Sequence, residues 1–216
     1  MMNFRETISE YSPGEELANS LTHGLGFVLS VAGLVVLEVL ASAHGDIWHV
    51  VSFAVFGTSL VLLYLSSTLY HAFRNPEIKH FFKKMDHSAI FMLIAGTYTP
   101  FMLINLRGPW GWTIFGVIWG LALFGIILKF LRIHHLKRLS LVLYLGMGWM
   151  CVIALKEMLE NVPVSGLYLL LAGGLCYSGG VFFYVWKRLR YGHALWHLFV
   201  LAGSVLHFFS VLSCLG

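Results

Sequence analysis

Long apolar stretches separated by short polar ones run along the whole chain. Each stretch is about 20 residues or more, the length that crosses a bilayer as a helix. None shows the strict alternation of a membrane barrel strand, so helix is the expected spanning form. Turn formers such as Gly45-Asp46 and Gly108-Pro109 separate the stretches. The pattern predicts an all-α, seven-helix transmembrane bundle with spans at 21–41, 48–73, 86–105, 110–130, 140–159, 164–186 and 193–215.

Composition supports the same class. Hydrophobic residues make up 58% of the 216, charged residues 11%, and the mean hydropathy is +0.80, whereas soluble domains carry roughly 25% charged residues. Seven spans take about 140 residues, which leaves no room for a separate soluble domain. The first 19 residues include Arg5, Glu15 and Glu16 and do not resemble a cleaved signal peptide. We expect 1–19 to be a short cytoplasmic segment and 20–216 to be a single transmembrane domain.

Basic residues predict the orientation. The connections at 74–85, 129–139 and 187–192 hold four, four and three Lys or Arg; with Arg5 this makes twelve, against only Arg107 and Lys156 on the other side. The positive-inside rule therefore predicts a cytoplasmic N-terminus and an external C-terminus. The net charge of +4 is explained by loops that meet anionic lipid headgroups, so membrane lipids are the expected partners and nucleic acid is not.

Four polar side chains in the spans are the candidate chemistry. His193 and His197 stand four residues apart, which places them on one helix face. His71 and Asp86 fall at the same cytoplasmic depth, and ionisable groups at membrane depth need partners because an unpartnered Asp costs about 2.5–3.5 kcal/mol. Ser67 lies one helical turn from His71, and His23 lies at similar depth.

Three of these residues suit a metal ion. If His71 meets His193 and His197, a tetrahedral zinc held by three imidazoles keeps one position open for water. A His-x-x-x-His pair alone is weak evidence, and it is the convergence with His71, Asp86 and Ser67 that favours a site. Histidines near helix ends are expected to be interfacial; these are His44, His49, His80, His87, His134 and His135. His207 lies deeper and is expected to bond to a neighbouring helix.

Small residues predict close helix contacts. Gly116-x-x-x-Gly120 and the pairs Gly173-Gly174 and Gly179-Gly180 are the candidate positions. The three cysteines are an odd number within spans and support neither a disulfide framework nor a thiolate metal site.

Five motifs occur in order along nearly the whole chain. They are Glu15-Glu16-x-x-Asn19-x-x-Thr22-His23-Gly24, Ser67-x-x-x-His71, Asp86-His87-Ser88-Ala89-Ile90, Ala95-Gly96-Thr97-Tyr98-Thr99-Pro100 and His193-x-x-x-His197. Together these motifs resemble the hemolysin III family, the bacterial branch of the progestin and adipoQ receptor superfamily, which is related more distantly to alkaline ceramidases.

The resemblance implies a multi-pass protein of the bacterial inner membrane with a zinc ion held by His71, His193 and His197 near the cytoplasmic side. It also implies that Asp86 bonds the zinc-bound water, with Ser67 close by. Such a site could hydrolyse an amide or ester. A membrane lipid cleaved at headgroup depth is the expected substrate, with ceramide-like amides suggested by analogy alone.

Two other classes of function stay open. The family's name implies a pore-forming protein or channel, whereas the polar residues gather at one end of the predicted bundle and channels carry polar groups along their length. The other class is a membrane sensor in which zinc has a structural role and no substrate is turned over. Closed structural zinc sites, however, usually have four protein ligands.

Overall fold

The computed structural model describes residues 11–131 and 137–215. Seven helical segments in it are long and apolar enough to cross a membrane, which confirms the predicted all-α bundle. The helices in chain order are α1 (Pro13–His44), α2 (Ile47–Ala72), α3 (Pro76–Pro100), the π-helical η2 (Phe101–Asn105), α4 (Pro109–Phe130), α5 (Lys137–Gly148), the 3₁₀ helix η4 (Met150–Ala154), α6 (Leu155–Asn161), α7 (Val164–Val185), α8 (Gly192–Leu212) and the 3₁₀ turn η5 (Ser213–Leu215).

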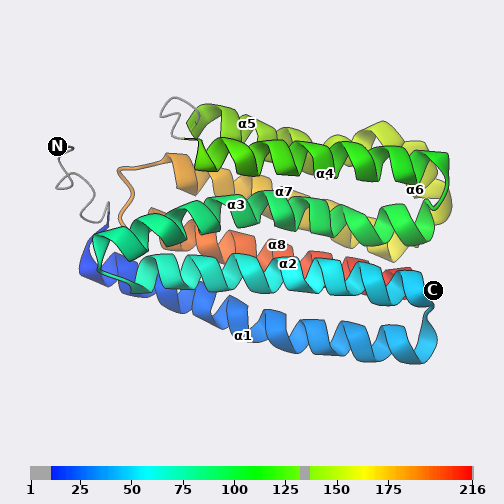
Figure 1. Ribbon diagram of the computed structural model, residues 1–216, viewed down its shortest axis with the longest axis horizontal. Helices are drawn as coiled ribbons and strands as arrows, with labels where there is room; N and C mark the ends of the chain where they lie inside the picture. Colours follow the sequence, from blue (N-terminus) through cyan, green and yellow to red (C-terminus); the bar gives the residue numbers. More distant parts are fainter. Residues whose placement is uncertain (1–10, 132–136, 216) are drawn as a thin grey trace.

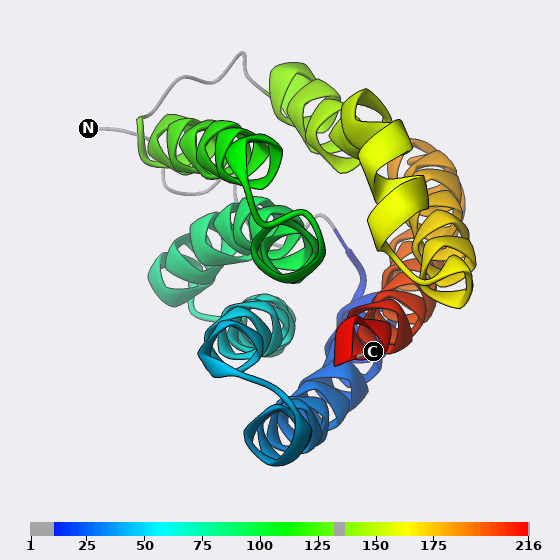
Figure 2. The same cartoon turned by 90° about the vertical axis from the view of Figure 1, so that its right-hand side faces the viewer.

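The spans lie side by side along one axis (Figure 1). Seen down that axis, they follow one another around the bundle, and α8 returns to lie beside α1 (Figure 2). The third span, α3 with η2, is the most enclosed, with 72% of its most apolar window buried against 22% for α1. Polar side chains on α2, α3 and α8 can therefore meet inside the bundle, away from lipid.

The inward face of α1 is small and polar. Its buried residues include Asn19, His23, Gly26 and Ser30, which recur every three or four positions, while Leu21 and others on the opposite face are exposed. Lipid tails are as apolar as leucine, so membrane helices associate through small residues and hydrogen bonds and not through leucine burial. This stripe faces α2 and α8.

Helix caps place two helix starts earlier than hydropathy predicted. The α3 helix starts at Pro76 and not at Asp86, because the Asn75 side chain accepts a hydrogen bond from the Glu77 N–H at 3.0 Å. The α1 helix starts at Pro13, where Ser12 and Glu15 form a capping box. Residues 13–19 of the expected N-terminal segment are thus helical, and residues 1–10 lie outside the described part of the chain.

The fifth span crosses as three pieces and not as the single helix predicted for 140–159. The α5 helix ends at Gly148, and the chain continues through η4 into α6. The Tyr98 hydroxyl of α3 lies at the break, 2.8 Å from Met147 O and 3.1 Å from Gly148 O, and accepts a hydrogen bond from Cys151 N–H at 2.8 Å. Backbone groups that lose their helical hydrogen bonds inside a membrane must find other partners. The Tyr98 hydroxyl is such a partner and thereby stabilises the break.

Interhelical hydrogen bonds join three spans at mid-bundle. Tyr64 of α2 donates to Ser204 of α8 at 2.7 Å, and the Tyr177 hydroxyl of α7 lies 2.8 Å from the same Ser204 oxygen. His207 lies deeper on α8, and its Nε2 bonds Leu170 O at 3.1 Å, as expected for a structural histidine.

The predicted glycine contacts divide into two groups. Gly173 does pack closely, since an added Cβ would collide with the His207 ring and lie 3.1 Å from Gly203 O. The prediction for Gly116 and Gly120 is wrong, because no atom of the described chain lies within 4 Å of a Cβ built at either position. The α4 face that carries them packs against no other helix of the described bundle.

We expect Gly173→Ala to destabilise the bundle by about 1–3 kcal/mol, the usual cost of overpacking. Gly116→Ala is the matched control and should leave stability unchanged, since its methyl group would lie within 4 Å of no atom of the described residues. Thermal unfolding of the detergent-purified variants measures both. Equal midpoints for the two would contradict the α7–α8 packing described above.

Candidate metal centre

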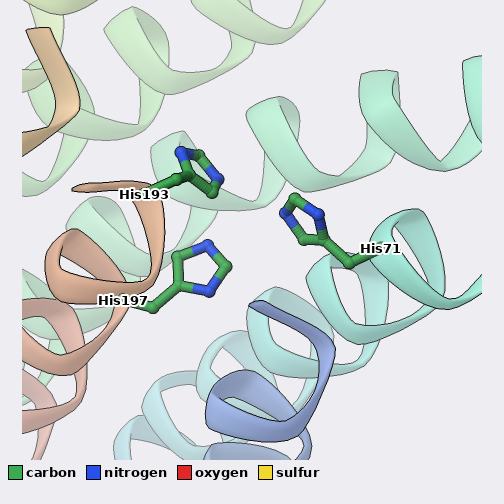
Figure 3. A group of neighbouring side chains, drawn as sticks. All are labelled: His71, His193 and His197. Carbon is green, nitrogen blue, oxygen red and sulfur yellow. The ribbon is translucent and has the colours of Figure 1, made fainter. Parts of the chain in front are cut away.

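Three histidines converge at the end of the bundle where α2 ends and α8 begins. His71 lies in the last turn of α2, and His193 and His197 lie in the first two turns of α8. Their rings face one another across the gap between the two helices (Figure 3). One ring nitrogen from each lies within 4.8 Å of the others. The structure thus brings together the three residues that the sequence predicted as metal ligands.

The start of α8 is fixed by the chain that precedes it. Tyr191 adopts a left-handed conformation with φ of 57°, uncommon for a residue with a side chain. Its N–H donates to Glu15 Oε1 at 3.0 Å, which ties this turn to the first turn of α1. His193 follows two residues later, so its position depends on this turn.

The unsatisfied nitrogens show that the residues fit a metal ion. The Nε2 atoms of His71, His193 and His197 are all buried without a hydrogen-bond partner among the described residues. A buried polar atom without a partner costs about 1–3 kcal/mol. Three in one place are explained if a cation accepts their lone pairs, since Zn–N bonds are about 2.0–2.1 Å and small ring rotations would close the site.

The other nitrogen of each ring has an oxygen partner. His71 Nδ1 lies 2.6 Å from Glu16 Oε2, and His193 Nδ1 lies 3.0 Å from the Tyr11 hydroxyl. His197 Nδ1 lies 3.2 Å from Asn19 O and from Thr22 Oγ1.

These partners decide the tautomers of two rings. A carbonyl oxygen and a carboxylate only accept, so His197 and His71 donate from Nδ1 and keep the Nε2 lone pair for a ligand. Bonds of this kind orient histidine ligands in metal sites.

Glu16 links three helices at the site. It comes from α1, contacts His71 of α2 through one oxygen and Lys79 of α3 through the other at 2.9 Å. Lys79 in turn donates to Tyr70 O at 2.8 Å and lies over the Tyr70 ring. Because both oxygens of Glu16 are engaged by fixed groups, its position against His71 is fixed too.

Asp86 and Ser67 lie on the inner faces of α3 and α2, both buried. The Asp86 carboxyl lies beside the Ser67 hydroxyl, although Ser67 Oγ makes no well-aligned hydrogen bond among the described residues. Ser67 lies one turn from His71 on the same helix face. Asp86 is therefore linked to the histidine face of α2 through Ser67, and it does not belong to the group of three residues that could hold an ion.

His23 supports the site but does not point into it. Its ring stacks on His197 with centroids 3.5 Å apart and an interplanar angle of 13°. Stacked rings direct their lone pairs in parallel planes, so His23 and His197 do not converge on one ion. His23 is a buried wall of the site.

Four supporting residues were not predicted as part of the site, namely Tyr11, Glu16, Asn19 and Thr22. Three of the four, Glu16, Asn19 and Thr22, come from α1, where they recur every three residues. That spacing puts them on one helix face. The same periodicity could have identified these three if the helix had been extended to Pro13.

Comparison with known proteins agrees with this geometry. Residues 11–208 match the family model described as "Haemolysin-III related". The chain belongs to this family.

Two bacterial relatives and one human relative are similar over most of the chain. "Hemolysin-3" of Bacillus cereus is 50% identical over 198 residues, 92% of this chain and 90% of the relative. "Hemolysin-3 homolog" of Bacillus subtilis (strain 168) is 47% identical over 92% of this chain and 93% of the relative. The human "Monocyte to macrophage differentiation factor" is 29% identical over 91% of this chain and 83% of its own, which supports the link to the progestin and adipoQ receptor superfamily.

Seven apolar helices and these bacterial relatives identify a multi-pass protein of the bacterial inner membrane. In the structure, the start of α3, the end of α4, the start of α5 and the α7–α8 connection lie at the end that holds the three histidines (Figure 1), and most of the described basic residues belong to these segments or to the short α2–α3 connection. That this end faces the cytoplasm stays a prediction of the positive-inside rule.

Glu16→Gln should weaken metal binding by about 10–100-fold, the usual effect of losing a carboxylate that orients a histidine ligand. Competition with a coloured chelator measures this affinity. Glu77→Gln is the control, because Glu77 lies exposed in the first turn of α3 at the same end of the bundle. A Glu16→Gln protein that holds metal as tightly as the Glu77→Gln protein would contradict the role given to Glu16.

Proposed function

We propose that this protein binds zinc at His71, His193 and His197 and is a membrane hydrolase that cleaves an amide or ester bond of a lipid. The observation that carries the proposal is the set of three unpartnered Nε2 atoms, with oxygen partners behind each ring. A purely nitrogen ligand set suits zinc, and three protein ligands leave one position open, as in catalytic zinc sites.

Zinc bound at this site supplies Lewis acidity and lowers the pKa of a coordinated water to about 7. The residues around it supply the rest of the chemistry. We propose that an oxygen of Asp86 accepts the proton of the attacking water and later returns it to the leaving group. Ser67 lies beside Asp86 on the histidine face of α2, and we propose that its hydroxyl orients that carboxylate.

The surroundings favour a lipid as the substrate. The site is enclosed by the first turns of α1 and α8 and the last turn of α2, at the end of the apolar layer. A lipid can place its polar linkage there while its chains stay in the bilayer. Ceramide-like amides are suggested only by analogy with the superfamily.

A pore is the second candidate, because the bacterial relatives are named hemolysins. Large apolar side chains fill the half of the bundle opposite the site: Phe53, Phe56 and Phe101 are almost completely buried there. An aqueous path needs polar groups along its length. The described bundle therefore supports a pore poorly.

A sensor with structural zinc is the third candidate, with the same three ligands but no turnover. Structural sites usually close with four protein ligands. No fourth His, Cys or carboxylate joins the three histidines among the described residues, which favours catalysis.

Asp86→Asn should retain most of the zinc and abolish lipid hydrolysis, because its role is to handle a proton and not to bind the metal. His71→Ala should lose both the metal and the activity. Zinc content by elemental analysis and release of fatty acid from labelled lipids measure the two properties on the same samples. If Asp86→Asn empties the site as His71→Ala does, Asp86 is a metal ligand and the assigned roles are wrong.

Enzyme and pore are separated in liposomes. We expect slow release of fatty acid from an amide or ester lipid, dependent on His71, Asp86, His193 and His197, with negligible leakage of a trapped dye. The double variant His193→Ala/His197→Ala should release none. Dye leakage that persists in this double variant, without lipid cleavage across a broad substrate panel, would favour the pore.

A further inference from the structure

A cleft of about 300 Å³ opens beside the metal centre. Its lining residues come from the start of α1, the end of α7, the α7–α8 connection and the start of α8. These segments lie at one end of the bundle in Figure 1. Its lining includes His193, so one residue belongs both to the cleft and to the proposed ligand set. The volume is at the lower end of the range for small-ligand pockets.

The cleft carries a positive charge. Lys187, Arg188 and Arg190 line it, against one acidic residue, Glu15. Both oxygens of Glu15 already accept hydrogen bonds, one from Tyr191 N–H at 3.0 Å and the other from Ser12 N–H at 3.0 Å. Among the described residues, neither Arg188 nor Arg190 forms an ion pair within 4.0 Å. Arg190 interacts electrostatically with Glu15 and lies over the Tyr191 ring at 5.3 Å, so the three cations leave a net positive charge at the cleft.

The wall of the cleft is aromatic, and the adjoining outer face of α7 is exposed and apolar. Phe183, Tyr184 and Trp186 of the α7 end line it. Trp186 is 46% exposed, and its neighbours on the outer face of α7, Phe182 and Val185, are more exposed still. Aromatic residues at the end of a span sit at the level of the lipid headgroups.

Cationic side chains, aromatic rings and a position at headgroup level together favour one class of ligand. We infer that this cleft binds the headgroup of an anionic phospholipid, with Arg188 and Arg190 contacting its phosphate while the glycerol and upper acyl chains lie against the aromatic wall. Arginine suits this task because its planar guanidinium can donate two hydrogen bonds to one phosphate.

The site goes beyond the proposed hydrolysis and does not require it. Basic residues at a membrane surface attract anionic lipids in general. The cleft predicts more than this attraction, namely one bound lipid per chain and dependence on two specific arginines. It also places that lipid against His193, where its ester linkage would lie near the metal centre if the proposed hydrolysis is correct.

Native mass spectrometry of the full chain in a neutral detergent tests the inference. The Asp86→Asn protein is titrated with short-chain phosphatidylglycerol, with phosphatidylcholine of the same chain length, and with inorganic phosphate alone. We expect one phosphatidylglycerol per chain, bound at least about tenfold more tightly than phosphatidylcholine or phosphate. Phosphate that binds as tightly as the lipid would make the free anion the ligand and overturn the lipid assignment.

The arginines are tested singly against a matched control. Arg188→Gln and Arg190→Gln should each weaken phosphatidylglycerol binding by about tenfold, and both side chains are exposed, so the fold should persist. Arg74→Gln should bind as the parent does, because Arg74 is exposed at the same end but outside the cleft. Equal weakening by all three variants, or by none, would overturn the site. Binding that persists in a protein without lipid turnover would leave this site standing while the proposed hydrolysis failed.

Discussion

A polar atom buried in a membrane bundle must find a partner, because the surrounding lipid offers none. At the basic end of this protein, that constraint fixes the positions of three helices. Glu16 of α1 lies between His71 of α2 and Lys79 of α3, with one carboxylate oxygen on each. Without this contact the histidine would lose its orientation, and a lysine and a carboxylate would stay buried without each other. The site and the packing of the helix ends are therefore one structure.

The same constraint explains the other departures from ideal helices. The fifth span breaks where Tyr98 can satisfy the freed backbone groups, and the turn before α8 adopts an uncommon conformation where Glu15 accepts its N–H. In each case a side chain from a distant part of the sequence supports the irregular backbone. Glu15 lies in the first two turns of α1 together with Glu16 and Asn19, which contact His71 and His197, so this short stretch is central to the site.

The sequence alone predicted the seven-helix bundle and the three histidines that the structure brings together. Hydropathy marks apolar layers, and His71, His193 and His197 stood out because polar residues are rare in them. The helix starts at Pro13 and Pro76 were not predicted, because capping residues and not hydropathy determine where a helix starts. Glu16 was missed as a supporting residue for the same reason, as it lay in a segment expected to precede the first span.

Other features depended on tertiary contacts that no local pattern contains. The break in the fifth span lies in an apolar window that reads as continuous helix, and only the position of Tyr98 makes it possible. Gly116 and Gly120 match a packing motif, yet their helix face meets no other part of the described bundle. The motif gives the ability to pack closely, whereas the order of the helices around the bundle decides whether a partner is present.

His193 belongs both to the candidate metal centre, a buried histidine cluster, and to the basic, aromatic cleft. Ser67 lies one turn from His71 toward the middle of α2, with Asp86 beside it, and we propose that the cleft lies at the level of the lipid headgroups. This arrangement suits a protein that acts on lipids at one face of the membrane better than one that conducts ions across it. The large buried phenylalanines in the opposite half of the bundle agree with that view.

X-ray absorption at the zinc edge of the purified protein tests the central claim most directly. The account predicts three nitrogen scatterers with the multiple-scattering pattern of imidazole and one oxygen, all at about 2.0–2.1 Å, and no sulfur. In the His197→Ala protein, the bound zinc or its imidazole signal should be lost. A sulfur-containing shell, or a spectrum unchanged by His197→Ala, would contradict the three-histidine centre.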